Sequence, residues 1–145
     1  MDERITQDRL IDVFERFRFI NLGTVDVDGF PWVSTVFFHF DYEFKVYFYS
    51  LPTTQHSVNI QSNPEVAFTI SSQSAENGHV EGVVYVGKAL LLQGADEESA
   101  FDFYRQRFNW IEEFPREHLM YVIIPREIWM INSELLGHSR RVKVF

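Results

Sequence analysis

Residues 31–70, PWVSTVFFHFDYEFKVYFYSLPTTQHSVNIQSNPEVAFTI, contain three strand-like runs, a short polar helix and the turns that join them. Strands are predicted from Pro31 to Phe40, from Lys45 to Ser50 and from Glu65 to Ser71, because aromatic and β-branched residues dominate each run. The helix is predicted from Thr54 to Asn63, and it ends there because the residue before a proline disfavours helix. Such short connections indicate antiparallel pairing, since parallel strands need long crossovers.

Upstream of this segment, the sequence predicts one helix and one strand. Apolar residues recur at helical spacing from Thr6 to Arg18, and Thr6 is a suitable N-cap. A strand is predicted from Phe19 to Asp28. It leads into Asp28-Gly29, a pair that is typical of a hairpin turn.

Downstream, the pattern continues with a long strand, a helix and two short strands. The long strand is predicted from Gly82 to Gln93, with Gly87 as a bulge or a point of close approach. Asp96 is predicted to cap the helix. The last two strands are predicted from Tyr121 to Ile124 and from Glu127 to Ile131. Six or seven antiparallel strands with short turns favour a meander or Greek-key barrel.

Composition limits the classes of partner. The chain has 145 residues, and we expect a single domain over residues 1–145. A net charge of −8 argues against a nucleic acid or an anionic membrane as partner. The absence of cysteine excludes disulfides, thiolate metal sites and a cysteine nucleophile. The N-terminus has no signal-peptide pattern and the apolar runs are too short to span a bilayer, so we expect a cytoplasmic protein.

A possible anion site lies where a predicted strand ends and the short helix begins. Ser50 closes the strand and Thr54 opens the helix, whose first backbone amides have no intrahelical acceptor. Hydroxyls beside such amides suit a phosphate. The alternative is that Thr54 only caps the helix, and the spacing alone favours this simpler interpretation.

Several short motifs resemble one family. They are Tyr49-Ser50, Thr54-Gln55-His56, the N-P-x-V-A run at 63–67, the G-x-A step at Gly87-Lys88-Ala89, and the tail step at His138-Ser139-Arg140. Together they resemble the pyridoxamine-phosphate-oxidase-like split barrels that bind FMN, over roughly residues 23–141. The Y-x-x-R-F helix at 104–108 and the Leu136-Gly137 ending are more similar still to a small group of bacterial proteins of unassigned function.

The resemblance implies a mainly β fold, a six-stranded antiparallel Greek-key split β-barrel with two or three flanking helices. It also implies a homodimer that binds FMN in a groove between its subunits. The implied flavin ring contacts are Ser34, Thr35 and Val36, and the implied phosphate contacts are Tyr49, Ser50, Thr54, Gln55 and His56. The partner subunit would close the groove with Trp129 and Arg140, and His138 is the expected substrate contact.

The chain departs from this family pattern at the phosphate. The oxidases hold the phosphate with an arginine and a lysine, whereas here those positions are Gln55 and His56. A neutral amide and a partly charged imidazole provide less charge-assisted bonding. We therefore expect weaker FMN binding, unless another cation such as Lys88 or Arg141 contributes. The substrate-binding R-P-x-x-S pattern is also absent, which argues against pyridoxamine phosphate as the substrate.

The function expected from the resemblance is a flavin-dependent oxidoreductase of unknown substrate, with hydride transfer at flavin N5. No residue stands out as a general acid or base, and the five histidines lack the spacing of a metal site. Two alternatives remain open: a flavin or heme carrier without turnover, and a dimeric interaction module that has lost its cofactor.

Overall fold

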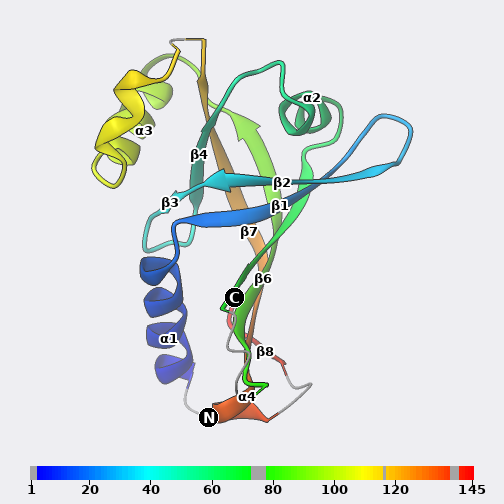
Figure 1. The fold of residues 1–145 in the computed structure, drawn as a ribbon, viewed down its shortest axis with the longest axis vertical. Coiled ribbons are helices and arrows are strands. Elements are labelled where there is room, and N and C mark those ends of the chain that lie inside the picture. Colours follow the sequence, from blue (N-terminus) through cyan, green and yellow to red (C-terminus); the bar gives the residue numbers. More distant parts are fainter. Residues whose placement is uncertain (1–2, 73–77, 116, 138–140) are drawn as a thin grey trace.

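The computed structural model describes residues 3–72, 78–115, 117–137 and 141–145, which form one curled antiparallel sheet with helices around it (Figure 1). The order of the strands is β2-β1-β5-β6-β7-β4-β3, and β8 pairs with β7. The strands are β1 (Phe19–Val25), β2 (Pro31–Phe37), β3 (His39–Phe40), β4 (Val46–Ser50), β5 (Glu65–Ser71), β6 (Glu81–Leu91), β7 (Leu119–Asn132) and β8 (Arg141–Lys143). The sheet curls into a half-barrel, as expected for a split barrel.

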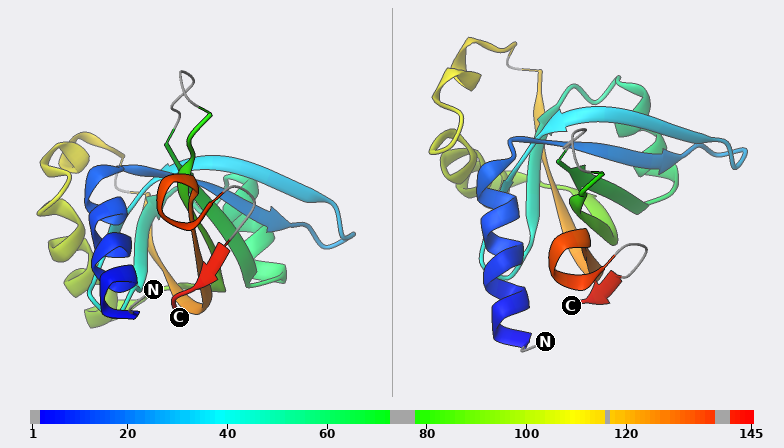
Figure 2. Two further views of the ribbon diagram at one scale, coloured as in Figure 1. Left: turned by 90° about the horizontal axis from the view of Figure 1, so that it is seen from below. Right: turned by 60° about the horizontal axis from the view of Figure 1, so that its bottom comes forward.

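The helices lie on two sides of this sheet. They are α1 (Glu3–Arg16), α2 (Gln55–Ser62), α3 (Gly94–Arg105), the 3-10 helix η1 (Asn109–Glu113) and α4 (Ser133–Leu136). Both α1 and α3 lie on one side of the molecule, while α2 lies on the other, beside the β1–β2 hairpin (Figures 1 and 2). Within the described ranges, no helix is long and apolar enough to cross a membrane.

Aromatic rings build much of the core, which accounts for many of the aromatic residues in the sequence. Phe14 of α1 makes edge-on contacts with Phe38, Phe40 and Phe44 at centroid distances of 5.1–5.8 Å. The Tyr85 hydroxyl donates to the Phe44 carbonyl oxygen at 2.6 Å, so its polar end is satisfied inside the core.

The long strand β7 corrects the prediction of two short strands, 121–124 and 127–131. The strand continues through Pro125 because a register shift in the pairing with β6 absorbs one extra residue there. The shift lies beside Gly87, as predicted. A Cβ atom at Gly87 would lie 2.3 Å from the carbonyl oxygen of Ile124, so the strands approach too closely there for any side chain.

Element boundaries also differ from the sequence predictions. The first helix begins at Glu3, before the predicted cap Thr6, and it ends at Arg16. Strand β1 ends at Val25, because the Asp26 carboxylate accepts from the amides of the following turn. Helix α3 follows Gln93 as its N-cap, so the predicted cap Asp96 lies within the first turn.

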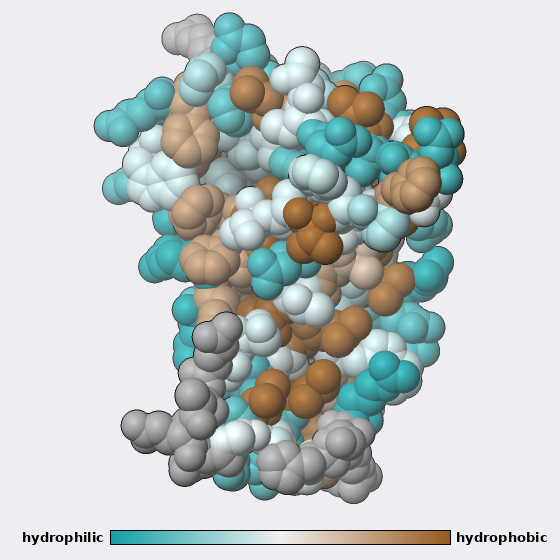
Figure 3. All heavy atoms as spheres, turned by 45° about the vertical axis from the view of Figure 1, so that its right-hand side comes forward, coloured by the Kyte–Doolittle hydropathy of each residue, from teal (hydrophilic) through white to brown (hydrophobic). Residues whose placement is uncertain are grey.

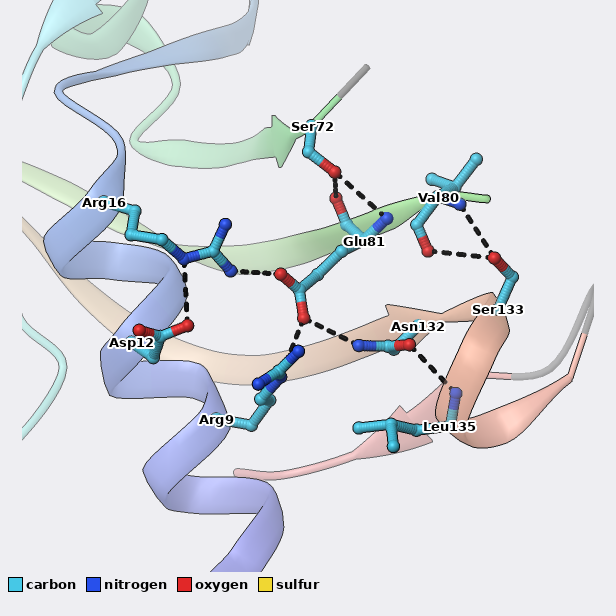
Figure 4. A network of polar contacts seen from close by, with 9 residues as sticks. All are labelled: Arg9, Asp12, Arg16, Ser72, Val80, Glu81, Asn132, Ser133 and Leu135. Atoms are coloured by element: carbon cyan, nitrogen blue, oxygen red, sulfur yellow. Dashed lines mark hydrogen bonds and ion pairs between the residues drawn. The ribbon is translucent and has the colours of Figure 1, made fainter. Parts of the chain in front are cut away.

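Two polar clusters attach α1 to the rest of the molecule. The Glu81 carboxylate on β6 accepts from Arg9, Arg16 and Asn132, with Arg9 Nε at 2.9 Å and Asn132 Nδ2 at 2.6 Å (Figure 4). At the other end of α1, the Arg107 guanidinium beyond α3 donates to four main-chain carbonyls. Its acceptors are the oxygens of Phe14, Glu15, Phe17 and Phe38.

Candidate functional site

The predicted phosphate contacts meet where β4 ends and α2 begins. Ser50 is the last residue of β4, and its Oγ lies 2.8 Å from His56 Nε2 in the first turn of α2. Thr54 is the N-cap of α2, and its Oγ1 lies 3.3 Å from the same imidazole nitrogen. The structure therefore brings Ser50, Thr54 and His56 into one hydrogen-bonded group.

The Thr54 hydroxyl also caps the helix, as the simpler interpretation required. Its Oγ1 accepts from the Ser57 amide at 3.4 Å and lies 2.7 Å from Ser57 Oγ. This cap satisfies one of the first helical amides. The amides of Gln55 and His56 precede it and have no intrahelical acceptor. These two main-chain amides thus remain as donors for a bound anion, beside the hydroxyls of Ser50 and Thr54.

The group carries no formal positive charge near neutral pH. His56 is 8% exposed, and this burial lowers the pKa of its imidazole, which favours the neutral ring. The Gln55 side chain turns along the helix, where its Nε2 donates to Asn59 Oδ1 at 2.7 Å. The site therefore offers hydroxyls, amides and a neutral imidazole in place of the arginine and lysine of the oxidases.

Tyr49 differs from its neighbour Ser50 in orientation. Successive side chains of a strand point to opposite faces. The ring of Tyr49 accordingly contacts Phe101 and His118, at centroid distances of 5.6 and 5.1 Å. Burial and the nearby Glu97 and Glu117 raise the pKa of Tyr49. The Tyr49 ring is therefore not part of the hydrogen-bonded group of Ser50, Thr54 and His56.

The predicted ring contacts lie on β2, the strand at one edge of the sheet. Ser34 Oγ is buried and has no hydrogen-bond partner within the described ranges, so its hydrogen-bonding capacity is unsatisfied. Thr35 is exposed and lies 3.4 Å from the Asn21 amide oxygen, while Val36 points into the core. Helix α2 contacts both β1 and β2, so the two halves of the predicted flavin site are neighbours within one protomer (Figure 1).

The other predicted contacts are not part of this group. Lys88 on β6 is exposed and lies opposite Glu65, which follows the C-terminal end of α2. The Trp129 ring lies on β7 under the side chains of Arg141 and Lys143, with the Arg141 guanidinium carbon 4.8 Å from the ring centroid. The predictions for His138 and Arg140 fall outside the described residues.

The hydrogen-bond donors at this site fit a flavin nucleotide, and they are neutral hydroxyls and amides. The unpartnered Ser34 hydroxyl is a donor where the ring is expected. The α2 amides and the Ser50 hydroxyl are donors where the phosphate is expected. The Thr54 hydroxyl donates to the Leu51 carbonyl oxygen at 2.9 Å and would have to turn from it to reach a phosphate. In the part of the chain that the structure describes, no group of three or more His, Cys, Asp or Glu residues is placed to hold a metal ion.

Three supporting residues were missed at the sequence level. Ser57 and Asn59 are polar but almost fully buried on α2, and Asn59 Nδ2 donates to the buried Thr24 hydroxyl at 3.0 Å. This bond attaches α2 to β1. The short polar run of α2 gave no apolar periodicity that would have identified its buried face.

Comparisons with known proteins agree with this fold. The family model described as "Pyridoxamine 5'-phosphate oxidase" matches residues 6–135. A UPF0306 protein of Yersinia pestis is 32% identical over 78 residues, which are 53% of this chain and 53% of that protein. The chain is thus aligned to about half the length of this relative.

Solved structures share the fold at low sequence identity. A heme binding protein from Mycobacterium smegmatis has a TM-score of 0.76 at 16% identity, covering 90% of this chain and 54% of that one. An FAD-binding protein from Mesorhizobium loti has a TM-score of 0.68 at 16% identity, covering 81% of this chain and 88% of that one. Such identities establish a common architecture and leave the ligand to be argued from the site.

Proposed function

Because the chain belongs to the pyridoxamine 5'-phosphate oxidase family, we propose that it binds FMN and acts as a flavin-dependent oxidoreductase on a small molecule. We further propose that it works as a homodimer in the cytoplasm. The absence of cysteine agrees with a reducing compartment. The Mesorhizobium loti protein of the same fold is named as FAD-binding, which supports a flavin in this architecture.

One observation carries the proposal. The Ser50 and Thr54 hydroxyls meet at the first turn of α2, directly beside the strand that carries the unpartnered Ser34 hydroxyl. A flavin nucleotide needs donors for a phosphate and for a polar ring edge at such neighbouring positions. A helix cap would explain Thr54, but it would not explain why the buried Ser34 hydroxyl has no hydrogen-bond partner among the described residues.

In the proposed mechanism, bound FMN supplies hydride transfer through its ring. The chain would orient it: Ser34 donates to the polar ring edge, while the hydroxyls and the α2 amides hold the phosphate. His138 would contact the substrate, and Trp129 and Arg140 of the partner subunit would close the groove. No described side chain is assigned a proton-transfer role.

The visible spectrum of freshly purified protein tests the proposal. We expect the two absorption bands of oxidised flavin, or strong quenching of FMN fluorescence when FMN is added to colourless protein. Consumption of NADPH by the FMN-loaded protein would then distinguish an enzyme from a carrier. A colourless protein that does not quench FMN would contradict flavin binding and favour an interaction module.

Replacing the hydroxyls tests where the phosphate lies. We expect the double variant Ser50→Ala/Thr54→Ala to weaken FMN binding by about tenfold or more, since hydrogen bonds to charged groups contribute about 1.5–3 kcal/mol. Riboflavin has no phosphate, so its binding should change much less. Fluorescence titration measures both affinities. Ser62→Ala, at the C-terminal end of α2, is the matched control. Equal losses for the two flavins would place the phosphate elsewhere.

A heme carrier is the second candidate, and one feature of the site favours it. The described phosphate contacts include no arginine or lysine, and the Mycobacterium smegmatis protein of the same fold is named as heme binding. A Soret band in the purified protein, without flavin bands, would replace the first proposal with this one.

A further inference from the structure

His56 stands at one of the two positions where the oxidases have a cationic side chain. A permanent cation there would make phosphate binding independent of pH, whereas the charge of an imidazole depends on pH. Its Nε2 atom lies within hydrogen-bond distance of two hydroxyl oxygens, at 2.8 Å from Ser50 and 3.3 Å from Thr54. Both hydroxyls are proposed phosphate donors. Any phosphate that they hold must therefore lie close to this imidazole, whose charge state will affect the binding energy.

Among the residues that the structure describes, no charged side chain acts on His56. Phe48 and Ser50 face it from β4, with the Phe48 ring centroid 6.0 Å away, and Thr54 faces it from the turn. The strands packed against α2 are β1 and β2, whose sequences FINLGTV and PWVSTVF contain no titratable side chain. Tyr47 and Tyr49 of β4 contact rings of α3 on the other face.

The two acidic residues of the neighbouring hairpin, Asp26 and Asp28, do not contribute to the pKa shift of His56. Asp26 lines a groove beside Gln55, on the outer side of α2, and its carboxylate accepts from the amides of Asp28 and Phe30. Burial alone lowers the pKa of His56. A dianionic phosphate would thus be the first charged group to act on this ring.

We propose that His56 makes the choice between FMN and riboflavin depend on a proton: FMN binding draws one proton from solvent onto His56, whereas riboflavin binding does not. This inference rests on the proposed flavin site and assigns it a specificity residue. The protonated ring would supply, only when a phosphate is present, the positive charge that the oxidases supply permanently.

The direction of the pH dependence follows from linkage. In the free protein the ring is neutral at pH 7 and above, whereas an adjacent anion raises the pKa of a group by about 1–3 units. FMN affinity therefore increases as pH falls from 8 towards 6. The gain is at most about tenfold for each unit of that shift, and it is complete only where the pH lies below the pKa of the free ring. Below about pH 6 the phosphate itself takes up a proton, so the useful range lies above that value.

The test measures both flavins at several pH values. Fluorescence titrations between pH 8 and 6 should show the ratio of riboflavin to FMN dissociation constants rising by about tenfold or more. The variant His56→Gln retains a hydrogen-bonding side chain and should show a constant ratio. His118→Gln, which removes a histidine on the Tyr49 side of β4, should retain the wild-type slope.

Calorimetry on the unmodified protein provides an independent measurement, so the inference does not depend on the folding of a variant. Titration of FMN in two buffers of different ionisation enthalpy should reveal proton uptake near pH 7, and titration of riboflavin should reveal none. A constant affinity ratio with both flavins bound, or an unchanged slope in His56→Gln, would overturn this inference and leave the flavin site intact. If neither flavin binds at any pH, the proposed function itself fails.

Discussion

His39 is a half-buried titratable residue away from the candidate site. Its imidazole stacks on the Phe103 ring with centroids 4.1 Å apart, and its Nδ1 atom is buried with no hydrogen-bond partner among the described residues. Burial, and to a smaller extent the nearby Arg107, lowers the pKa of His39 to about 4. The unfolded chain keeps a histidine pKa near 6.5. The unfolded state therefore binds more protons between pH 4 and 6.5.

This difference predicts the acid sensitivity of the fold. The free energy of unfolding should decrease as pH falls from about 6.5 to 4, by up to about 1.4 kcal/mol per pH unit for each such histidine. The lowered pKa of His56 acts in the same direction. Urea denaturation at a series of pH values measures the slope. His39→Phe keeps a stacked ring and should reduce the slope, and an unchanged slope would exclude His39 as its source.

At the scale of residues, the sequence located part of the candidate site. The pair Ser50 and Thr54 was identified because a strand end and a helix start require adjacent caps and donors. The burial of His56 depends on how α2 packs on β1 and β2, which local sequence does not reveal. Because successive side chains of a strand alternate, Tyr49 points away from Ser50. The family motif had grouped the two residues as phosphate contacts.

At the scale of elements, the close contact of β6 with β7 gives a sharp mutational test. Gly87→Ala places a methyl group against the Ile124 carbonyl oxygen, within 2.3 Å before any movement. We expect the free energy of unfolding to fall by about 2–4 kcal/mol, because backbone strands must separate to relieve the overlap. Chemical denaturation measures this loss.

The neighbouring position provides the control. Lys88 is exposed on the same strand, so Lys88→Ala should change the free energy of unfolding by less than about 0.5 kcal/mol. A Gly87→Ala protein as stable as the control would show that β6 and β7 are further apart than described.

Most strands were predicted from sequence because aromatic and β-branched runs were bounded by turn residues. Gly87 was predicted to be a bulge or a point of close approach, and the close approach is what the structure shows. The extra residue of the register shift is Arg126 in β7, where one strand continues past Pro125, and the sequence did not predict this. The two-residue β3 was included in the strand before it, since Phe38 interrupts the pairing without any turn signal. Such interruptions depend on long-range contacts, here the hydrogen bond from the Phe38 amide to the Arg18 carbonyl.

At the scale of the whole molecule, the exposed edge strand β2 is the candidate subunit interface. Trp32 and Val33 are 50% and 69% exposed, and β2 has a sheet neighbour on one side only. Apolar side chains are visible among polar ones on the face of the molecule shown in Figure 3. An edge strand with exposed apolar residues favours association with a second copy.

This interface can be tested by charge. Sedimentation should show a dimer for the unmodified chain and a monomer for Val33→Lys, because burying an unpaired ammonium group is costly. Leu135→Lys changes another exposed apolar residue, on α4, and should leave the dimer intact. FMN binding should be lost together with the dimer, since the proposed groove needs both subunits. A dimeric Val33→Lys protein would place the interface elsewhere.

The hydrogen bonds from the Arg107 guanidinium to distant parts of the chain all end on main-chain oxygens, although its carbon also lies 4.9 Å from the Phe38 ring centroid. Every residue type carries such an oxygen, so substitutions at 14, 15, 17 and 38 would leave these hydrogen-bond acceptors in place. Correlated substitutions in related sequences would therefore not reveal this joint. A mutational scan of the acceptor positions would report lost packing instead, because Phe14 and Phe38 are buried in the core, and only replacement of the arginine itself would expose the loss of these hydrogen bonds.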